Sequence, residues 1–136
     1  MQVVIDTNVL VSGLLNPSGF PGEMVDMIFS RQIEPAYDDR ILHEYSVVLR
    51  RTTFSFPHEA VDDLLDAVRV LGVRVVPAHF AMKLPDDGDR MFVECGLSIG
   101  SKVVVTGNKR HFPVSVVHGL LIVSPKEFFE KHLRRQ

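Results

Sequence analysis

The stretch that decides the fold is Val3-Val4-Ile5-Asp6-Thr7-Asn8, close to the start of the chain. Its three apolar, β-branched residues predict a short strand buried on both faces, as the strands of parallel sheets are. A helical pattern begins at about Asn8, so Asp6 stands at the carboxyl end of the strand. Open α/β sheets bind ligands along this edge. Asp6 is therefore either a ligand-binding carboxylate or, like Thr7 and Asn8, a cap for the helix that follows.

Short β-branched runs alternate with longer helical segments along the rest of the chain. This alternation favours a parallel sheet with helices on its faces. We therefore expect an α/β fold in one domain spanning residues 1–136. Pro35 lies in one of the expected strands, and it either weakens the assignment of that strand or places it near an edge of the sheet. The expected strands cover residues 3–5, 33–37, 73–76, 103–105 and 121–123.

Composition limits the function classes. Hydrophobic residues make up 46% of the 136 residues and charged residues 24%, which is the balance of an ordinary globular protein. The longest apolar runs are far shorter than a membrane span, and the first residues lack the basic start of a signal peptide, so we expect a cytoplasmic protein. The single cysteine, Cys95, excludes an internal disulfide and a cysteine-rich zinc module.

The net charge of −2 gives no overall positive field of the kind that drives sequence-independent nucleic-acid binding. A polyanion would have to be held locally. The basic segments Arg50-Arg51 and Lys109-Arg110-His111 are candidates for this, although solvated cations near helix ends are the commoner explanation for each segment taken alone.

Glu44 lies in a segment whose Ile41, Tyr45 and Val48 define the buried face of a helix. At about 100° per residue, Glu44 is about 60° from Ile41, at the rim of that face. A glutamate in this position either extends to solvent or has an inward partner, such as a metal ion or a basic side chain.

Three acids, Asp86, Asp87 and Asp89, stand at the start of a helix that is expected to run to Ile99. Acids at a helix N-terminus cap free amides and suit the helix dipole, but that role needs only one or two of them. Asp89 falls on the side of the helix that carries Phe92, so it is expected to point towards the sheet.

Convergence of Asp6, Glu44 and Asp89 would be costly, because like charges about 4 Å apart repel by roughly 4 kcal/mol per pair at an effective dielectric near 20. Such a cluster must protonate in part, with raised pKa values, or bind a cation.

A second buried strand ends at Thr106-Gly107-Asn108, which adds hydroxyl and amide oxygens at the same edge. Oxygen ligands favour Mg²⁺ or Mn²⁺ over zinc. None of the six His residues forms a metal-ligand pair at helical spacing, and the role of His111 is the most open.

On these residues the chain resembles the PIN-domain proteins, in particular the small bacterial and archaeal ones that are toxin-like components of toxin–antitoxin systems. The resemblance covers almost the full length and rests on four segments in order: Val3 to Asn8, Ile41 to Tyr45, Asp86 to Phe92 and Val105 to Asn108. It implies a three-layer α/β/α sandwich with a parallel sheet of four to five strands in the order 3-2-1-4-5. The ends of the first and fourth strands would then share one pocket.

The resemblance also implies roles for individual residues. It implies that four acids are catalytic residues. Three of them would bind the metal (Asp6, Glu44 and Asp89), and one would be accessory (Asp86). It implies supporting polar residues around the metal (Asn8, Thr106 and Asn108) and flanking cations that could hold phosphates (Arg90, Lys109 and Arg110). Many PIN nucleases have an acid where this chain has Asn108, so the charge of the site is lower and a tight second metal ion is in doubt.

The function implied by the resemblance is metal-dependent endoribonuclease activity on single-stranded RNA, with Mg²⁺ or Mn²⁺ as cofactor, a small antitoxin protein as partner, and self-association as a homodimer. A DNA-directed or structure-specific nuclease would use the same acids. A phosphatase with Asp6 as nucleophile lacks its usual second aspartate, because Asn8 stands two residues later. A catalytically weak binding module that acts through a partner protein is the remaining alternative, and Asn108 favours it.

Overall fold

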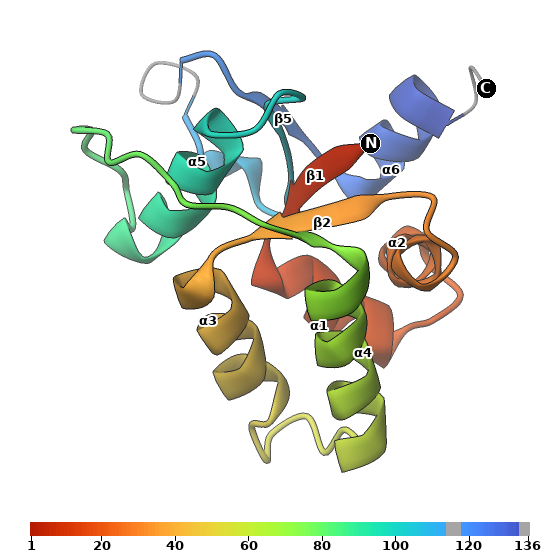
Figure 1. Ribbon diagram of the computed structural model, residues 1–136. Coiled ribbons are helices and arrows are strands. Elements are labelled where there is room, and N and C mark those ends of the chain that lie inside the picture. Colours follow the sequence, from red (N-terminus) through yellow and green to blue (C-terminus); the bar gives the residue numbers. More distant parts are fainter. Residues whose placement is uncertain (114–117, 134–136) are drawn as a thin grey trace.

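The computed structural model describes residues 1–113 and 118–133. Its centre is a parallel sheet of five strands in the order β3-β2-β1-β4-β5, which confirms the predicted α/β/α fold and strand order (Figure 1). The strands are β1 (Gln2–Ile5), β2 (Glu34–Tyr37), β3 (Val73–Arg74), β4 (Val103–Val105) and β5 (Leu121–Val123). The α-helices are α1 (Thr7–Leu15), α2 (Phe20–Phe29), α3 (Asp39–Leu49), α4 (His58–Leu71), α5 (Arg90–Leu97) and α6 (Pro125–Phe128). None of the helices in the described ranges is long and apolar enough to cross a membrane.

The strand order decides which face of the sheet each helix covers. The connections from β1 to β2 and from β2 to β3 step in one direction, whereas the connection from β3 through α5 to β4 steps back past β1. Because such crossovers are right-handed, α5 lies on the face opposite to the earlier helices. It packs on β1, β2 and β4, while α2 packs against α1, α4 and α6 in the other layer (Figure 1). Helix α3 contacts α1, α4 and α5, so it lies beside the carboxyl edge of the central strands.

The central strands carry the core of the protein. The three apolar residues of β1 and all of β4 are buried on both faces, as their β-branched runs predict. Tyr45 of α3 is also fully buried, and its hydroxyl donates a hydrogen bond to the backbone oxygen of Ile5. This contact fixes α3 against the end of β1, so Glu44, the neighbour of Tyr45, is held close to Asp6.

Pro35 does not lie at the edge of the sheet, which corrects the expectation for its strand. Strand β2 has β1 on one side and β3 on the other. The Glu34 nitrogen donates to Met1 on the β1 side, so the Pro35 nitrogen faces the β3 side, where pairing begins only at Ala36. The missing N–H of proline therefore leaves no gap in the hydrogen-bond ladder.

The segment after β3 differs from the expected strand and helix boundaries. Strand β3 ends at Arg74, although Val75 N still donates to Tyr37 O of β2 at 2.7 Å. Further along, the backbone amides turn to the α5 side: Ala78 N donates to Ser98 Oγ (3.1 Å) and Phe80 N donates to Glu94 Oε2 (3.0 Å). The next helix is not continuous over residues 86–99. It starts with a 3₁₀ turn, η1 (Asp87–Asp89), and α5 proper covers only Arg90–Leu97. The Asp86 side chain accepts a hydrogen bond from Gly88 N at 2.8 Å, which tightens this first turn.

Arg40 joins the two helices that carry predicted acids. Its guanidinium bonds at 2.8 Å to Asp38, the N-cap of α3, and at 2.8 Å to Glu94 on α5. The side chains of Asp38 and Glu94 are only 5% and 2% exposed, so each carboxylate needs a cation. Arg40 thus neutralises two buried charges and holds α3 and α5 together.

We predict that Arg40→Met destabilises the protein by about 2 kcal/mol. Removing one partner of a fully buried pair costs about 3–5 kcal/mol, and the partial exposure of Arg40 reduces this value. Arg74→Met is the matched control, because Arg74 pairs with Asp39 and both side chains are largely exposed. Urea unfolding of the two variants measures the difference. Equal losses in the two variants would show that Arg40 is only a surface cation.

Candidate active site

Asp6 and Thr106 meet at the carboxyl ends of neighbouring strands. Strands β1 and β4 pair with Ile5 beside Val105, so the next residues of the two strands lie side by side. Thr106 Oγ1 donates a hydrogen bond to Asp6 Oδ2 at 2.7 Å. Asp6 occupies the N-cap position of α1, yet its side chain makes no capping hydrogen bond. The carboxylate is therefore turned towards β4, although the backbone N–H groups of Thr7 and Asn8 lie near enough to lower its pKa.

Glu44 has an inward partner, and that partner is a hydroxyl group. Thr7, the first residue of α1, donates from Oγ1 to Glu44 Oε2 at 2.9 Å. Thr7 is buried and Glu44 is half-buried, so the bond lies at the rim of the buried face, where the helical spacing places Glu44. The bond holds the Glu44 side chain beside the start of α1, immediately after Asp6.

Asp89 is 8% exposed and points inward, as its position on the helix predicts. Its Oδ2 atom is buried and has no hydrogen-bond donor among the residues that the structure describes. The imidazole of His111 lies beside it, with Nδ1 3.1 Å from Oδ2. His111 ends a 3₁₀ turn, η2 (Lys109–His111), and its Nε2 lies 3.0 Å from the side-chain nitrogen of Asn108. Asn108 in turn donates from its backbone nitrogen to Thr106 Oγ1 at 3.0 Å.

The acids act on one another electrostatically. The pKa of Asp89 is raised from its ordinary value of 3.8 to about 6. Burial is the largest cause, the negative charge of Asp6 is the next, and Asp86 and Glu44 add smaller contributions in the same direction. His111 opposes this shift. Burial also raises the pKa of Asp6, against the lowering effect of the Thr106 hydrogen bond. The four predicted acids therefore belong to one electrostatic site around Asp89.

The other predicted site residues lie further out. Asp86 is exposed and caps η1 through Gly88, and Asn8 is exposed on the first turn of α1. Arg90 bonds to Asp87 and to the backbone oxygens of residues 80 and 82, so its guanidinium faces the segment before α5. Lys109 bonds to Glu127 at 3.0 Å. Arg110 is exposed. The structure thus gathers Asp6, Glu44, Asp89, Thr106 and Asn108, and it turns Arg90 and Lys109 towards other partners.

Two contacts in the site were not predicted from the sequence. The sequence predicts only a capping role for Thr7, although a hydroxyl next to Asp6 on a buried helix face is well placed to bond a second acid. His111 stands three residues after Asn108, and residues at this spacing lie over one another in a 3₁₀ turn. The spacing of three residues is the sequence feature that could have predicted the contact of Asn108 with His111. The 3₁₀ turn that it requires has no strong sequence pattern.

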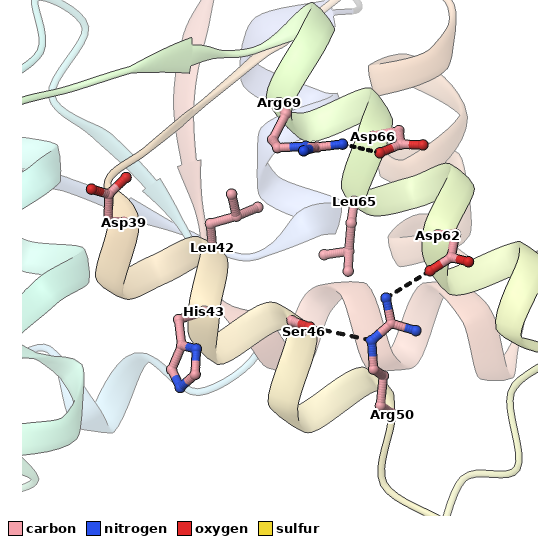
Figure 2. Close-up of a pocket in the computed structure, with 9 residues that line it drawn as sticks. All are labelled: Asp39, Leu42, His43, Ser46, Arg50, Asp62, Leu65, Asp66 and Arg69. Carbon is pink, nitrogen blue, oxygen red and sulfur yellow. Dashed lines mark hydrogen bonds and ion pairs between the residues drawn. The ribbon is translucent and has the colours of Figure 1, made fainter.

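A cavity of about 520 Å³ lies elsewhere, between α3 and α4 (Figure 2). Figure 2 shows that its arginines are already paired, Arg50 with Asp62 and Arg69 with Asp66. None of the four predicted acids lines it. Both arginines of the cavity are therefore neutralised by neighbouring acids, and the cavity is separate from the predicted acidic site.

Comparison with known proteins identifies the family of this chain. The sequence model of the PIN domain matches residues 2–110, which include every acid of the site. The chain belongs to the PIN-domain family. It is also similar to an uncharacterized protein of Methanocaldococcus jannaschii, with 28% identity over 145 residues that cover 96% of this chain and 91% of that protein. No solved structure matches the chain.

The donor atoms of this PIN domain suit a hard divalent cation, the kind of ion that PIN domains generally use. They are carboxylate oxygens, and the buried Asp89 Oδ2 has no hydrogen-bond donor in the described parts of the chain. Within residues 1–113 and 118–133, no three His, Cys, Asp or Glu side chains gather closely enough to enclose an ion. Mg²⁺ usually keeps several waters and binds one or two carboxylates, so an enclosing cluster is not required. Asp6 and Asp89 are the acids best placed to hold such an ion.

We predict that Asp89→Asn stabilises the cation-free PIN domain at about pH 8. Because the pKa of Asp89 is raised in the folded protein, the folded protein keeps the Asp89 proton to a higher pH than the unfolded chain does. The contribution of Asp89 to the free energy of unfolding is therefore complete below about pH 4, and it is lost as the pH rises through about 6. After a discount for solvent screening, the gain at about pH 8 is about 1–2 kcal/mol. Urea unfolding in EDTA at several pH values measures it. A variant less stable than the natural protein at high pH would contradict the repulsion described above.

Proposed function

We propose that this PIN domain is a Mg²⁺- or Mn²⁺-dependent endoribonuclease that cleaves single-stranded RNA. Membership of the PIN family supports a nuclease in general. The observation that carries the proposal is the buried Asp89 carboxylate, whose neighbours Asp6, Glu44 and Asp86 all raise its pKa. A fold gains no stability from such repulsion, so the arrangement favours a site whose charge is balanced by a ligand. A divalent cation and the phosphate that it brings fit that requirement.

The side chains of the site have distinct tasks in this proposal. A bound divalent cation would polarise the scissile phosphate and ease the ionisation of the attacking water. Asp6 and Asp89 would bind the cation. The Thr106 and Thr7 hydroxyls fix the carboxylates of Asp6 and Glu44, so the two acids keep one orientation when the substrate arrives. Because the acids repel the RNA backbone, binding of RNA as well as cleavage is expected to depend on the cation.

A single strand is the proposed substrate because the protein has little positive charge with which to hold a duplex. Its net charge is −2, and Lys109 near the site is already bonded to Glu127. Arg110 remains exposed beside the site, so it is the proposed contact for a phosphate next to the cleaved one. Local contacts of this kind suit a short flexible strand more than the regular backbone of a helix.

The proposal also includes a biological setting, which rests on the family resemblance alone. In this setting the protein is the toxin-like member of a toxin–antitoxin pair, it forms homodimers, and a small antitoxin protein binds it. A short reading frame next to the gene would support the pairing. Light scattering of the purified protein measures the oligomeric state.

We predict that the protein cleaves unstructured RNA in Mn²⁺ and that EDTA abolishes the cleavage. Asp6→Asn and Asp89→Asn are each expected to lower the rate by about 100-fold or more, because each removes a charged ligand worth several kcal/mol in the transition state. Asp63→Asn is the matched control, since Asp63 is an exposed aspartate on α4, outside the site. Gel electrophoresis of labelled RNA gives the rates.

The outcomes separate the alternatives. Cleavage that survives both EDTA and the two site substitutions would exclude these acids as the active site. Parallel assays with single-stranded DNA and with structured RNA distinguish a DNA-directed or structure-specific nuclease. Binding of RNA without cleavage in Mn²⁺ would favour the weak binding module, the alternative that the missing acid at Asn108 supports.

A further inference from the structure

In the parts of the chain that the structure describes, the imidazole of His111 lies against an acid of the site, Asp89. His111 lies on η2, directly after β4, and its side chain is 36% exposed, so one side of the ring faces the acids while another is open to solvent. The four acids of the site supply oxygen ligands, and the role proposed for them does not involve the imidazole nitrogen. The question is therefore what the imidazole does beside Asp89.

The contact between His111 and Asp89 has an unusual geometry for an ion pair. Nδ1 lies 3.1 Å from Oδ2, yet Oδ2 accepts no hydrogen bond from any described residue, so the ring nitrogen does not aim a proton at it. Two ligands at right angles around an octahedral ion, each about 2.1 Å from it, lie about 3.0 Å apart. The separation of the two atoms matches that of adjacent ligands on one ion.

Asn108 supports the ring from its other side. His111 Nε2 lies 3.0 Å from the Asn108 side-chain amide. An imidazole that binds a metal through Nδ1 carries its proton on Nε2 and donates it to an oxygen, and the Asn108 amide can present its oxygen by rotating about its last bond. Asn108, which stands where many PIN nucleases have an acid, is thus in position to orient His111 as a nitrogen ligand.

We propose that His111 binds, through Nδ1, the same divalent cation that Asp89 binds through Oδ2. This inference rests on the proposed function, because it requires that the acids hold a cation. Mn²⁺ also favours oxygen ligands, but as a transition-metal ion it accepts an imidazole nitrogen more readily than Mg²⁺ does. The nitrogen ligand therefore makes the site select Mn²⁺ over Mg²⁺. It also adds a ligand to a site that lacks a carboxylate at Asn108.

Electron paramagnetic resonance of Mn²⁺ tests this inference without reference to activity. The signal of free Mn²⁺ during a titration gives the binding constant, and displacement of bound Mn²⁺ by Mg²⁺ gives the selectivity. Pulsed measurements detect the magnetic coupling of bound Mn²⁺ to a directly bound nitrogen. The natural protein is expected to show nitrogen coupling. His111→Gln is expected to lose the coupling and about tenfold or more in Mn²⁺ affinity, with a much smaller change for Mg²⁺. His111→Asp is expected to recover affinity without nitrogen coupling and to bind Mg²⁺ better than the natural protein.

His58→Gln is the control, because His58 is exposed at the start of α4 and is expected to leave both quantities unchanged. Mn²⁺ bound without nitrogen coupling in the natural protein would overturn the role of His111 and leave the proposed function standing. Coupling that persists in His111→Gln would assign the nitrogen to another histidine and overturn it as well. Failure of the natural protein to bind Mn²⁺ would overturn both this inference and the proposed function.

Discussion

Repulsion between carboxylates at one edge of the sheet is the constraint on which the account of this protein depends. The pKa of Asp89 rises to about 6 because the side chain is buried and because Asp6, Asp86 and Glu44 are negative neighbours. Such a group destabilises the folded state at neutral pH unless a cation is present. The protein therefore tolerates an arrangement that its own stability does not favour, which is typical of sites kept for binding or catalysis.

The scaffold holds these acids in place through a few contacts outside the acidic set. The adjacency of β1 and β4 brings Thr106 to Asp6, and the Tyr45 hydroxyl fixes α3 against the end of β1. Arg40 binds one buried carboxylate at the start of α3 and another on α5, so α3, which carries Glu44, is held to the helix that directly follows Asp89. The geometry of the site thus depends on residues that never touch a substrate.

The sequence predicts the parts of this structure that have local patterns. The runs at 3–5 and 103–105 are apolar and β-branched, so buried parallel strands follow directly, and Asp6 is placed by being the next residue. The strand order, and with it the meeting of Asp6 and Thr106, came from the family resemblance. The partnership of Arg40 with Glu94 spans 54 positions, and no local pattern reports it. The contacts of Thr7 with Glu44 and of His111 with Asp89 depend in the same way on tertiary packing.

A crystal structure of the protein soaked in Mn²⁺, with the ion located by its anomalous scattering, tests the central claim most directly. The account predicts an ion at the carboxyl edge of the sheet, within about 2.5 Å of carboxylate oxygens of both Asp6 and Asp89. Mn²⁺ that binds only at other places, or acids that stay bonded to their hydroxyl partners with no ion between them, would contradict it.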